Sequence, residues 1–181
     1  DIMNKLKGKY ICSLVLLLSL QLSYAQLSRT HYIPPICAAD NSNATPQNQF
    51  LHISTPSVSP VSVTVTEIGG TVSVLSASNA NPIEILIGSG TNTPFIADVN
   101  TTGTKYTNKG YSIQADQPVY ASVRLIAGVS QSQAGSLVSK GLSGLGTTFR
   151  IGTFTNQKTF TSASTDYLNF VSVIATENNT Q

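Results

Sequence analysis

Two histidines are the residues of this sequence best suited to bind a metal or transfer a proton. His31 stands in a polar, proline-containing stretch, and His52 lies between Leu51 and Ile53 in a segment that we expect to be a strand. A zinc site requires three or four His, Cys or carboxylate ligands, and no recognised ligand spacing is present. The sequence therefore predicts no metal site. We expect His52 at the surface or in an interface, on the strand face opposite Leu51 and Ile53.

The glycine-rich segment 140–148 (KGLSGLGTT) matches two enzymatic loops only in part. A phosphate-binding loop has its lysine after the last glycine, but Lys140 precedes the glycines and a predicted strand follows them. A nucleophile elbow has the pattern Gly-x-Ser-x-Gly, but Leu145 occupies the second glycine position after Ser143. We therefore expect these glycines to serve a tight backbone path that needs a positive φ or a close approach of strands.

The carboxylates of the chain are scattered among predicted turns and strands. A glycosidase needs only two of them, about 5–10 Å apart, so sequence spacing alone leaves a secreted carbohydrate-active enzyme open as an alternative. No aromatic-rich sugar platform accompanies them, and no catalytic motif is present. We expect no catalytic residue, no cofactor and no enzymatic activity. The carboxylates considered are Glu67, Glu84, Asp98, Asp116 and Asp166, and Asp116 is typical of a turn because Gln117-Pro118 follows it.

The N-terminus has the composition of a bacterial secretory signal peptide. Met3 is the expected start, and it is followed by three lysines within six residues. The apolar run 10–22 comes next. It is as long as a signal core and too short for a spanning helix of about 20 residues. An N-terminal membrane anchor is the alternative, but polar chain follows at once without a stop-transfer charge.

A peptidase site ends this predicted signal peptide. Ser23 and Ala25 place small residues at the −3 and −1 positions. We therefore expect residues 1–25 to be removed by cleavage between Ala25 and Gln26. Lipoprotein processing would need a cysteine at the position of Gln26, so we expect release without a lipid.

The signal peptide also accounts for the net charge of the chain. Of ten basic and eight acidic residues, three basic and one acidic lie within residues 1–25, so residues 26–181 carry seven of each. Such a neutral surface offers no electrostatic attraction for nucleic acid or anionic lipid. We expect a secreted or outer-surface protein with no nucleic-acid partner and no membrane contact after cleavage. Cys37 is the only cysteine left, which excludes an internal disulfide, and we expect it to be buried.

Two parts follow the signal peptide. Residues 26–48 lack a sustained period and contain Pro34-Pro35, so we expect an extended lead-in. Residues 49–181 form the expected β-rich module, in which alternating β-branched runs predict about eight strands. Pro60, Pro82 and Pro118 each directly precede one of them, and 67–70 predicts a hairpin turn. The strands are expected at 50–53, 61–66, 71–75, 83–87, 111–115, 119–125, 147–154 and 167–175.

These patterns predict an all-β fold. The best helical candidate, 131–145, contains three glycines that each cost about 1 kcal/mol in a helix, so we expect a structured loop with room for one helical turn. The expected class is an antiparallel β-sandwich-like module preceded by a signal-peptide helix, with a propeller-like or barrel arrangement as the alternative. We expect ligand-facing residues in loops 101–109 and 130–140, because function concentrates in loops on β-scaffolds.

Two stretches carry a family resemblance. Residues 27–35 (LSRTHYIPP) resemble the opening of large secreted proteins from gliding bacteria of the Bacteroidetes group. Residues 133–150 (QAGSLVSKGLSGLGTTFR) resemble the signature of the IgGFc-binding-protein N-terminal domain family, and 121–124 and 175–180 fit the same family. The resemblance covers most of residues 27–181.

The resemblance implies a non-catalytic binding or adhesion module at the front of a larger extracellular protein. Such proteins often end in a gliding-motility-associated C-terminal domain that is read by type IX secretion. The family strand at 175–180 should run on past Gln181, so we expect a truncated domain. An extracellular protein or glycan is the expected ligand, and no Fc-contacting residue can be carried over. A structural role in a surface layer or motility filament is a further alternative.

Overall fold

The computed structural model describes residues 26–38, 45–101, 103–128, 133–152, 170–177 and 180. The expected signal peptide, residues 1–25, lies outside the described residues. The described part contains nine strands and two short 3-10 turns, and none of its helices is long and apolar enough to span a bilayer. The elements are β1 (Ser28–Ile33), β2 (Ile36–Ala38), β3 (Pro46–Ser54), β4 (Val61–Glu67), β5 (Val72–Ala77), β6 (Ile83–Gly88), β7 (Ile96–Asp98), η2 (Val99–Thr101), β8 (Tyr111–Ala127), β9 (Gln133–Val138) and η3 (Gly141–Gly144).

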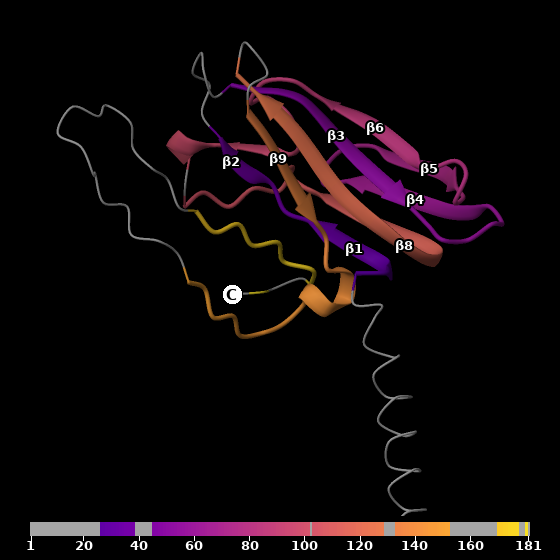
Figure 1. Cartoon of the computed structure of the whole chain (residues 1–181). Coiled ribbons are helices and arrows are strands. Elements are labelled where there is room, and N and C mark those ends of the chain that lie inside the picture. Colours follow the sequence, from indigo (N-terminus) through magenta and orange to yellow (C-terminus); the bar gives the residue numbers. More distant parts are fainter. Residues whose placement is uncertain are drawn as a thin grey trace, which may run out of the picture.

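Strand β8 is the axis of a seven-stranded antiparallel sheet (Figure 1). Its first half pairs with β1 on one side and β4 on the other, and its second half pairs with β9 and β3. β5 extends the sheet beyond β4, and β6 extends it beyond β3. The sheet curls into a nearly closed, barrel-like form. The all-β class is therefore confirmed, and the barrel alternative describes its shape. β2 and β7 form a separate parallel pair.

The core lies inside this curled sheet and comes from strict alternation. Val61, Val63 and Val65 of β4 are buried, as are Leu51 and Ile53 of β3. Alternate side chains of a strand point to opposite faces, so one face of each wing contributes to the same core. Full burial of each such side chain stabilises the fold by about 1.5–3 kcal/mol. β8 adds Tyr111, Ile113, Val119, Ala121 and Val123 to this core.

The two strands expected at 111–115 and 119–125 are one bent strand. Pairing with β4 ends at Ala115 and pairing with β3 begins at Tyr120. Pro118 therefore lies within β8, not before a strand as expected, and its missing N–H falls where neither β3 nor β4 is paired. The prediction of a turn at Asp116 is also wrong, because its carboxylate accepts the backbone N–H of Ser62 at 3.1 Å.

The predicted lead-in, 26–48, contributes to the sheet. β1 pairs with the first half of β8 and buries His31 and Ile33 completely or nearly so. The boundary expected at residue 48 also falls inside β3, which begins at Pro46. The N-terminal segment is thus extended as expected, but it is part of the module. The reason is tertiary: β8 leaves one edge open, and β1 supplies its ladder partner.

The C-terminal half differs most from expectation. Residues 147–152 and 170–175 are not strands, and 153–169 lie outside the described residues. Residues 133–138, expected in a loop, form β9, while the single helical turn is present as η3. β9 contains Gly135 and could not be recognised locally, because pairing with β8 defines it. The remainder of the expected loop at 130–132 lies outside the described residues.

Gly141 performs the backbone task expected for the glycine-rich segment. Its φ is +57°, a region that disfavours residues with a Cβ. A Cβ built there would lie 2.2 Å from the Cβ of Ser28. The chain therefore turns closely past the start of β1 at a point where only glycine fits.

We predict that Gly141→Ala destabilises the protein by at least about 1–3 kcal/mol, through a strained φ and the clash with Ser28. Gly152→Ala is the control, because Gly152 has no positive φ and no neighbouring atom within 4 Å of a Cβ. Urea unfolding of both variants measures the difference. Equal stability of the two variants would contradict the assignment.

Candidate functional site

The outer surface of the β6–β3–β8 wing carries an aromatic and charged cluster. The buried residues of β3 and β8 are Leu51, Ile53, Ala121 and Val123, so their neighbours in sequence point outward. We call the outward set the aromatic face; it consists of Phe50, His52, Glu84, Leu86, Tyr120 and Arg124.

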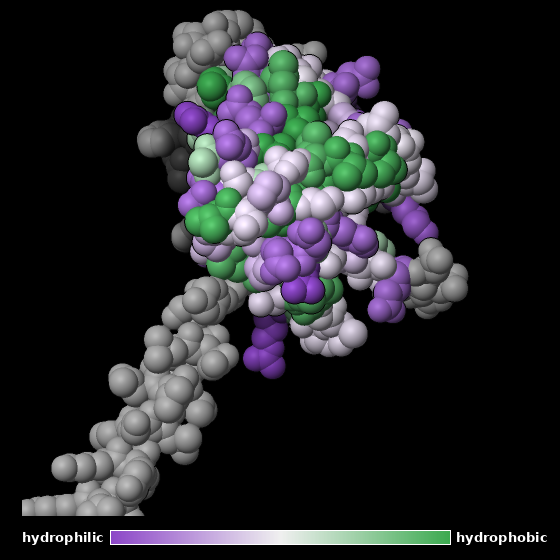
Figure 2. Space-filling view, turned by 90° about the vertical axis from the view of Figure 1, so that its right-hand side faces the viewer, coloured by the Kyte–Doolittle hydropathy of each residue, from purple (hydrophilic) through white to green (hydrophobic). Residues whose placement is uncertain are grey.

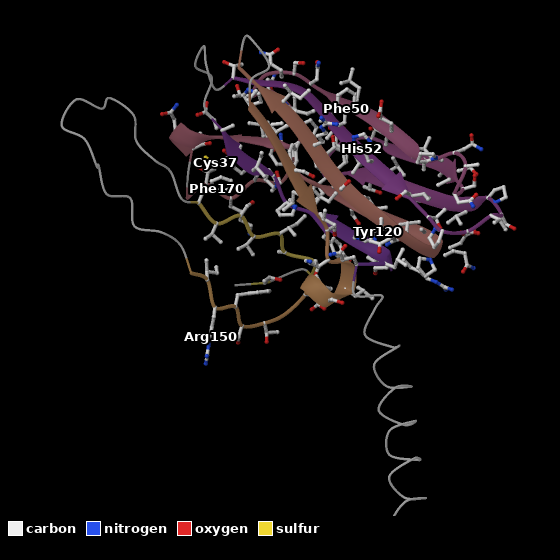
Figure 3. The ribbon with its side chains drawn as sticks, viewed as in Figure 1. Cys37, Phe50, His52, Tyr120, Arg150 and Phe170 are labelled. Atoms are coloured by element: carbon white, nitrogen blue, oxygen red, sulfur yellow. The ribbon has the colours of Figure 1, made fainter. Side chains whose placement is uncertain are left out.

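The strand register brings these side chains together. Phe50 is opposite Leu86 on one side and Arg124 on the other. One step along β3, His52 Nδ1 lies 3.5 Å from Glu84 Oε2. The rings of Phe50 and His52 are 5.9 Å apart and tilted by 34°. Figure 3 shows Phe50, His52 and Tyr120 succeeding one another along the wing.

This arrangement can bind a ligand that has both apolar and polar surface. Leu86 is 61% exposed and Tyr120 is 37% exposed, so apolar area is available for contact. Aromatic side chains lose little conformational entropy on binding and combine an apolar body with, in tyrosine, a polar tip. Arg124 donates hydrogen bonds and Glu84 accepts them, and together they leave the face without a dominant charge. Sugar rings and protein surfaces both offer such mixed chemistry.

Only part of this face could be predicted. The expectation that His52 lies on the surface opposite Leu51 and Ile53 is confirmed. Phe50, Tyr120 and Arg124 were not recognised as a group, because the statement that no aromatic platform exists considered the chain and not the register. The available signal was alternation: in both strands these residues occupy the positions between buried ones.

Loop 101–109, expected to face a ligand, borders a cavity of about 330 Å³. The opposite side of the cavity is formed by 170–175, and Figure 3 places Phe170 beside Cys37 there. The polar groups of the loop contact the protein itself: Thr101 Oγ1 hydrogen-bonds the Tyr106 hydroxyl, and Lys109 Nζ donates to the carbonyl of Thr93 at 2.5 Å. The loop prediction thus coincides with a cavity, although its described polar groups serve mainly to shape the loop.

The chemistry of this cavity is subdued. Burial and the nearby Asp98 carboxylate raise the pKa of the Cys37 thiol, so it stays protonated at neutral pH. Cys37 is half-buried, short of the burial expected for it. Burial also lowers the pKa of Lys109. Among the described residues no three His, Cys, Asp or Glu side chains gather as a metal site would require.

The described carboxylates occupy separate places. Glu84 contacts His52 on the aromatic face, and Asp116 accepts a hydrogen bond from Ser62 at the bend of β8. Asp98 accepts from the backbone and side-chain nitrogens of Asn100 at 2.8 and 2.9 Å. Glu67 ends β4, and Asp166 lies outside the described residues. Each described carboxylate is thus explained by its own strand or turn.

His31 is a structural residue, with all its polar atoms satisfied. Its Nε2 lies 2.8 Å from the carbonyl of Val119 and 3.1 Å from that of Ser28, so Nε2 must carry the proton. Its Nδ1 then accepts from Ser139 Oγ at 3.0 Å. Ser139 Oγ in turn accepts the N–H of Gly141. The neutral ring therefore connects β1, the bend of β8 and the segment after β9.

Comparison with known proteins identifies no family for this chain. No family model matches it, and no curated protein matches it. The crystal structure of Thermotoga maritima 1070 aligns with 63% of this chain and 97% of that one, at 11% identity and a TM-score of 0.32. A similarity this low carries no argument about fold or function. The resemblance to the IgGFc-binding-protein N-terminal domain family stays a prediction.

His31 predicts a pH dependence of stability. Burial lowers its pKa below the ordinary 6.5, so the unfolded chain binds a proton at a pH where the folded chain does not. The stability that this neutral ring contributes is fully present above pH 6.5 and is lost as the pH falls from there through the folded-state pKa. The slope is at most about 1.4 kcal/mol per pH unit.

Urea unfolding between pH 5 and 8 measures this slope. We expect His31→Gln to be less stable at pH 7.5 and to lose the part of the slope just below pH 6.5. If His31→Gln keeps the wild-type slope, another group is responsible and the assignment of the neutral ring is wrong.

Proposed function

We propose that this chain is a non-catalytic binding or adhesion module of the cell exterior, at the front of a larger extracellular protein. Its ligand is an extracellular glycan or protein. The aromatic face carries the proposal, because two outward aromatic rings and an imidazole lie among paired charges on one wing. Exposed hydrophobic clusters rimmed by polar groups mark interaction sites in soluble proteins.

The geometry of the face favours recognition over chemistry. It is the flat outside of a sheet, so it can follow an extended glycan or a protein epitope without enclosing it. Its aromatic side chains are of the type that dominates binding energy at interfaces. Its acid and base, Glu84 and His52, contact each other at 3.5 Å. A neutral module of this kind acts by contact area, with charge used for specificity.

The proposed location rests on the signal peptide in the sequence. Residues 1–25 combine lysines, an apolar core and small residues before Gln26. A module neutral over residues 26–181 also suits the cell exterior, where neither nucleic acid nor an anionic leaflet is its partner. Secretion to the outer surface and attachment there by type IX secretion complete the proposal.

We predict that export removes residues 1–25. Expression of the whole chain in a bacterial host, followed by N-terminal sequencing of the periplasmic protein, is expected to give Gln26 as the first residue. Ala25→Arg is expected to block cleavage, since the −1 position requires a small residue, whereas Tyr24→Ala is expected to be processed normally. Uncleaved wild-type protein in the inner-membrane fraction would support an anchor instead.

We also predict that the aromatic face binds the ligand. A glycan array and a panel of extracellular proteins, immunoglobulin Fc included, identify ligands of the wild-type protein. Phe50→Ala and Tyr120→Ala are then each expected to weaken binding by about 1 kcal/mol or more, roughly fivefold. Phe149→Ala is the matched control, because Phe149 is 57% exposed and lies outside the face.

Thermal unfolding of the variants separates lost binding from lost folding. Equal weakening by all three substitutions would move the binding site away from the aromatic face. A measurable hydrolase activity together with no binding on either panel would overturn the proposed function.

A further inference from the structure

The free edge of β5 is built to accept another strand. Within the described residues β5 pairs only with β4. The backbone N–H of Glu67 donates to the carbonyl of Thr71 at 2.9 Å, which makes 67 and 71 a hydrogen-bonded pair. Such pairs alternate along an antiparallel ladder. Residues 73, 75 and 77 of β5 therefore bond to β4, and Val72, Val74 and Ser76 direct their N–H and C=O groups away from it.

This edge lacks the usual protection against pairing. Natural edge strands carry a charge, a proline or a bulge that prevents association. Residues 68–81 contain neither a charged residue nor a proline, and the β4–β5 register is unbroken. Two other edge strands differ, because β1 contains Arg29 and β6 contains Glu84.

Apolar side chains accompany these unpaired backbone groups. Val72 and Val74 point outward and are 63% and 69% exposed. Figure 2 views the side of the molecule on which β5 lies in Figure 1, and hydrophobic side chains gather there in bands. A strand added to this edge would gain hydrogen bonds and cover both valines. The occupant must therefore be an extended, uncharged segment.

We propose that this occupant is β5 of a second copy of the chain, paired antiparallel about a two-fold axis at Val74. In that register Val74 is opposite its own counterpart, and Val72 is opposite Ser76 of the second copy. All three are the residues with outward backbone groups, so each pair exchanges two hydrogen bonds. The surface is self-complementary, as a two-fold interface requires. No charge within the strand opposes a like charge.

The dimer is weak and concentration-dependent, because one short strand from each copy buries less area than a standard interface. It goes beyond the proposed function by doubling the number of aromatic faces in one particle. Two linked faces raise the avidity for a repeated surface ligand without any new ligand contact.

Sedimentation of the exported chain over a concentration series tests the dimer. Val74→Lys places two like charges opposite each other and removes a valine contact, so we expect the dimer dissociation constant to rise about tenfold or more. Leu142→Lys is the control: Leu142 is 57% exposed in η3, beside β1 at the opposite edge of that wing, and should leave the constant unchanged.

Two backbone variants separate the edge from general surface effects. Val74→Pro removes only an outward N–H and is expected to give a folded monomer. Ser73→Pro removes an N–H bonded to β4 and is expected to destabilise the fold itself. In a Cys12→Ser, Cys37→Ser background, Val74→Cys is expected to form an intermolecular disulfide, since paired Cα atoms about 5.5 Å apart suit one.

A wild-type chain that stays monomeric up to roughly 1 mM overturns the proposal. A dimer that Val74→Lys and Leu142→Lys weaken equally overturns it as well, as does a monomer that instead binds another extended polypeptide at β5. None of these results bears on ligand binding by the aromatic face, which is measured on monomer and dimer separately.

Discussion

Strand β8 is the element to which every other strand of the large sheet is bonded, directly or through one neighbour. Its partners change between Ala115 and Tyr120, so two wings leave a common axis and curl around one core. The bend needs backbone groups that are not part of a ladder. Pro118 has no N–H to leave unpaired, and Asp116 supplies an acceptor for Ser62 in place of a ladder bond. A straight β8 would leave the two wings without a shared interior.

The bend also decides where interaction surfaces lie. The C-terminal half of β8 places Tyr120 and Arg124 beside β3 and so completes the aromatic face, while β5, at the end of the other wing, has a free edge. His31 bonds to the carbonyl of Val119 at the bend and to Ser139 after β9, which joins the chain on both sides of this region. Binding by one wing and association through the other are therefore compatible, because they use different halves of the same axis.

The elements predicted correctly were those whose pattern is local. Val61, Val63 and Val65 announced β4 by alternation, and the β4–β5 hairpin followed from its turn residues. β1, β2, β7 and β9 were missed because they are short or polar and are strands only through their partners. The segments at 147–152 and 170–175 have strand-like composition, yet the structure pairs neither of them. Composition favours a strand, but hydrogen-bonded pairing decides it.

For this protein the sequence alone determined the all-β class, the outward position of His52, the need for glycine in segment 140–148 and the neutrality of residues 26–181. These properties depend on alternation, local backbone freedom and counted charge, all of which act over a few residues or over the whole chain. The tertiary structure decided the continuity of β8, the structural role of His31, the aromatic face and the free edge of β5. Each of these depends on register between strands distant in sequence, and a shift of one residue would reverse every side chain involved.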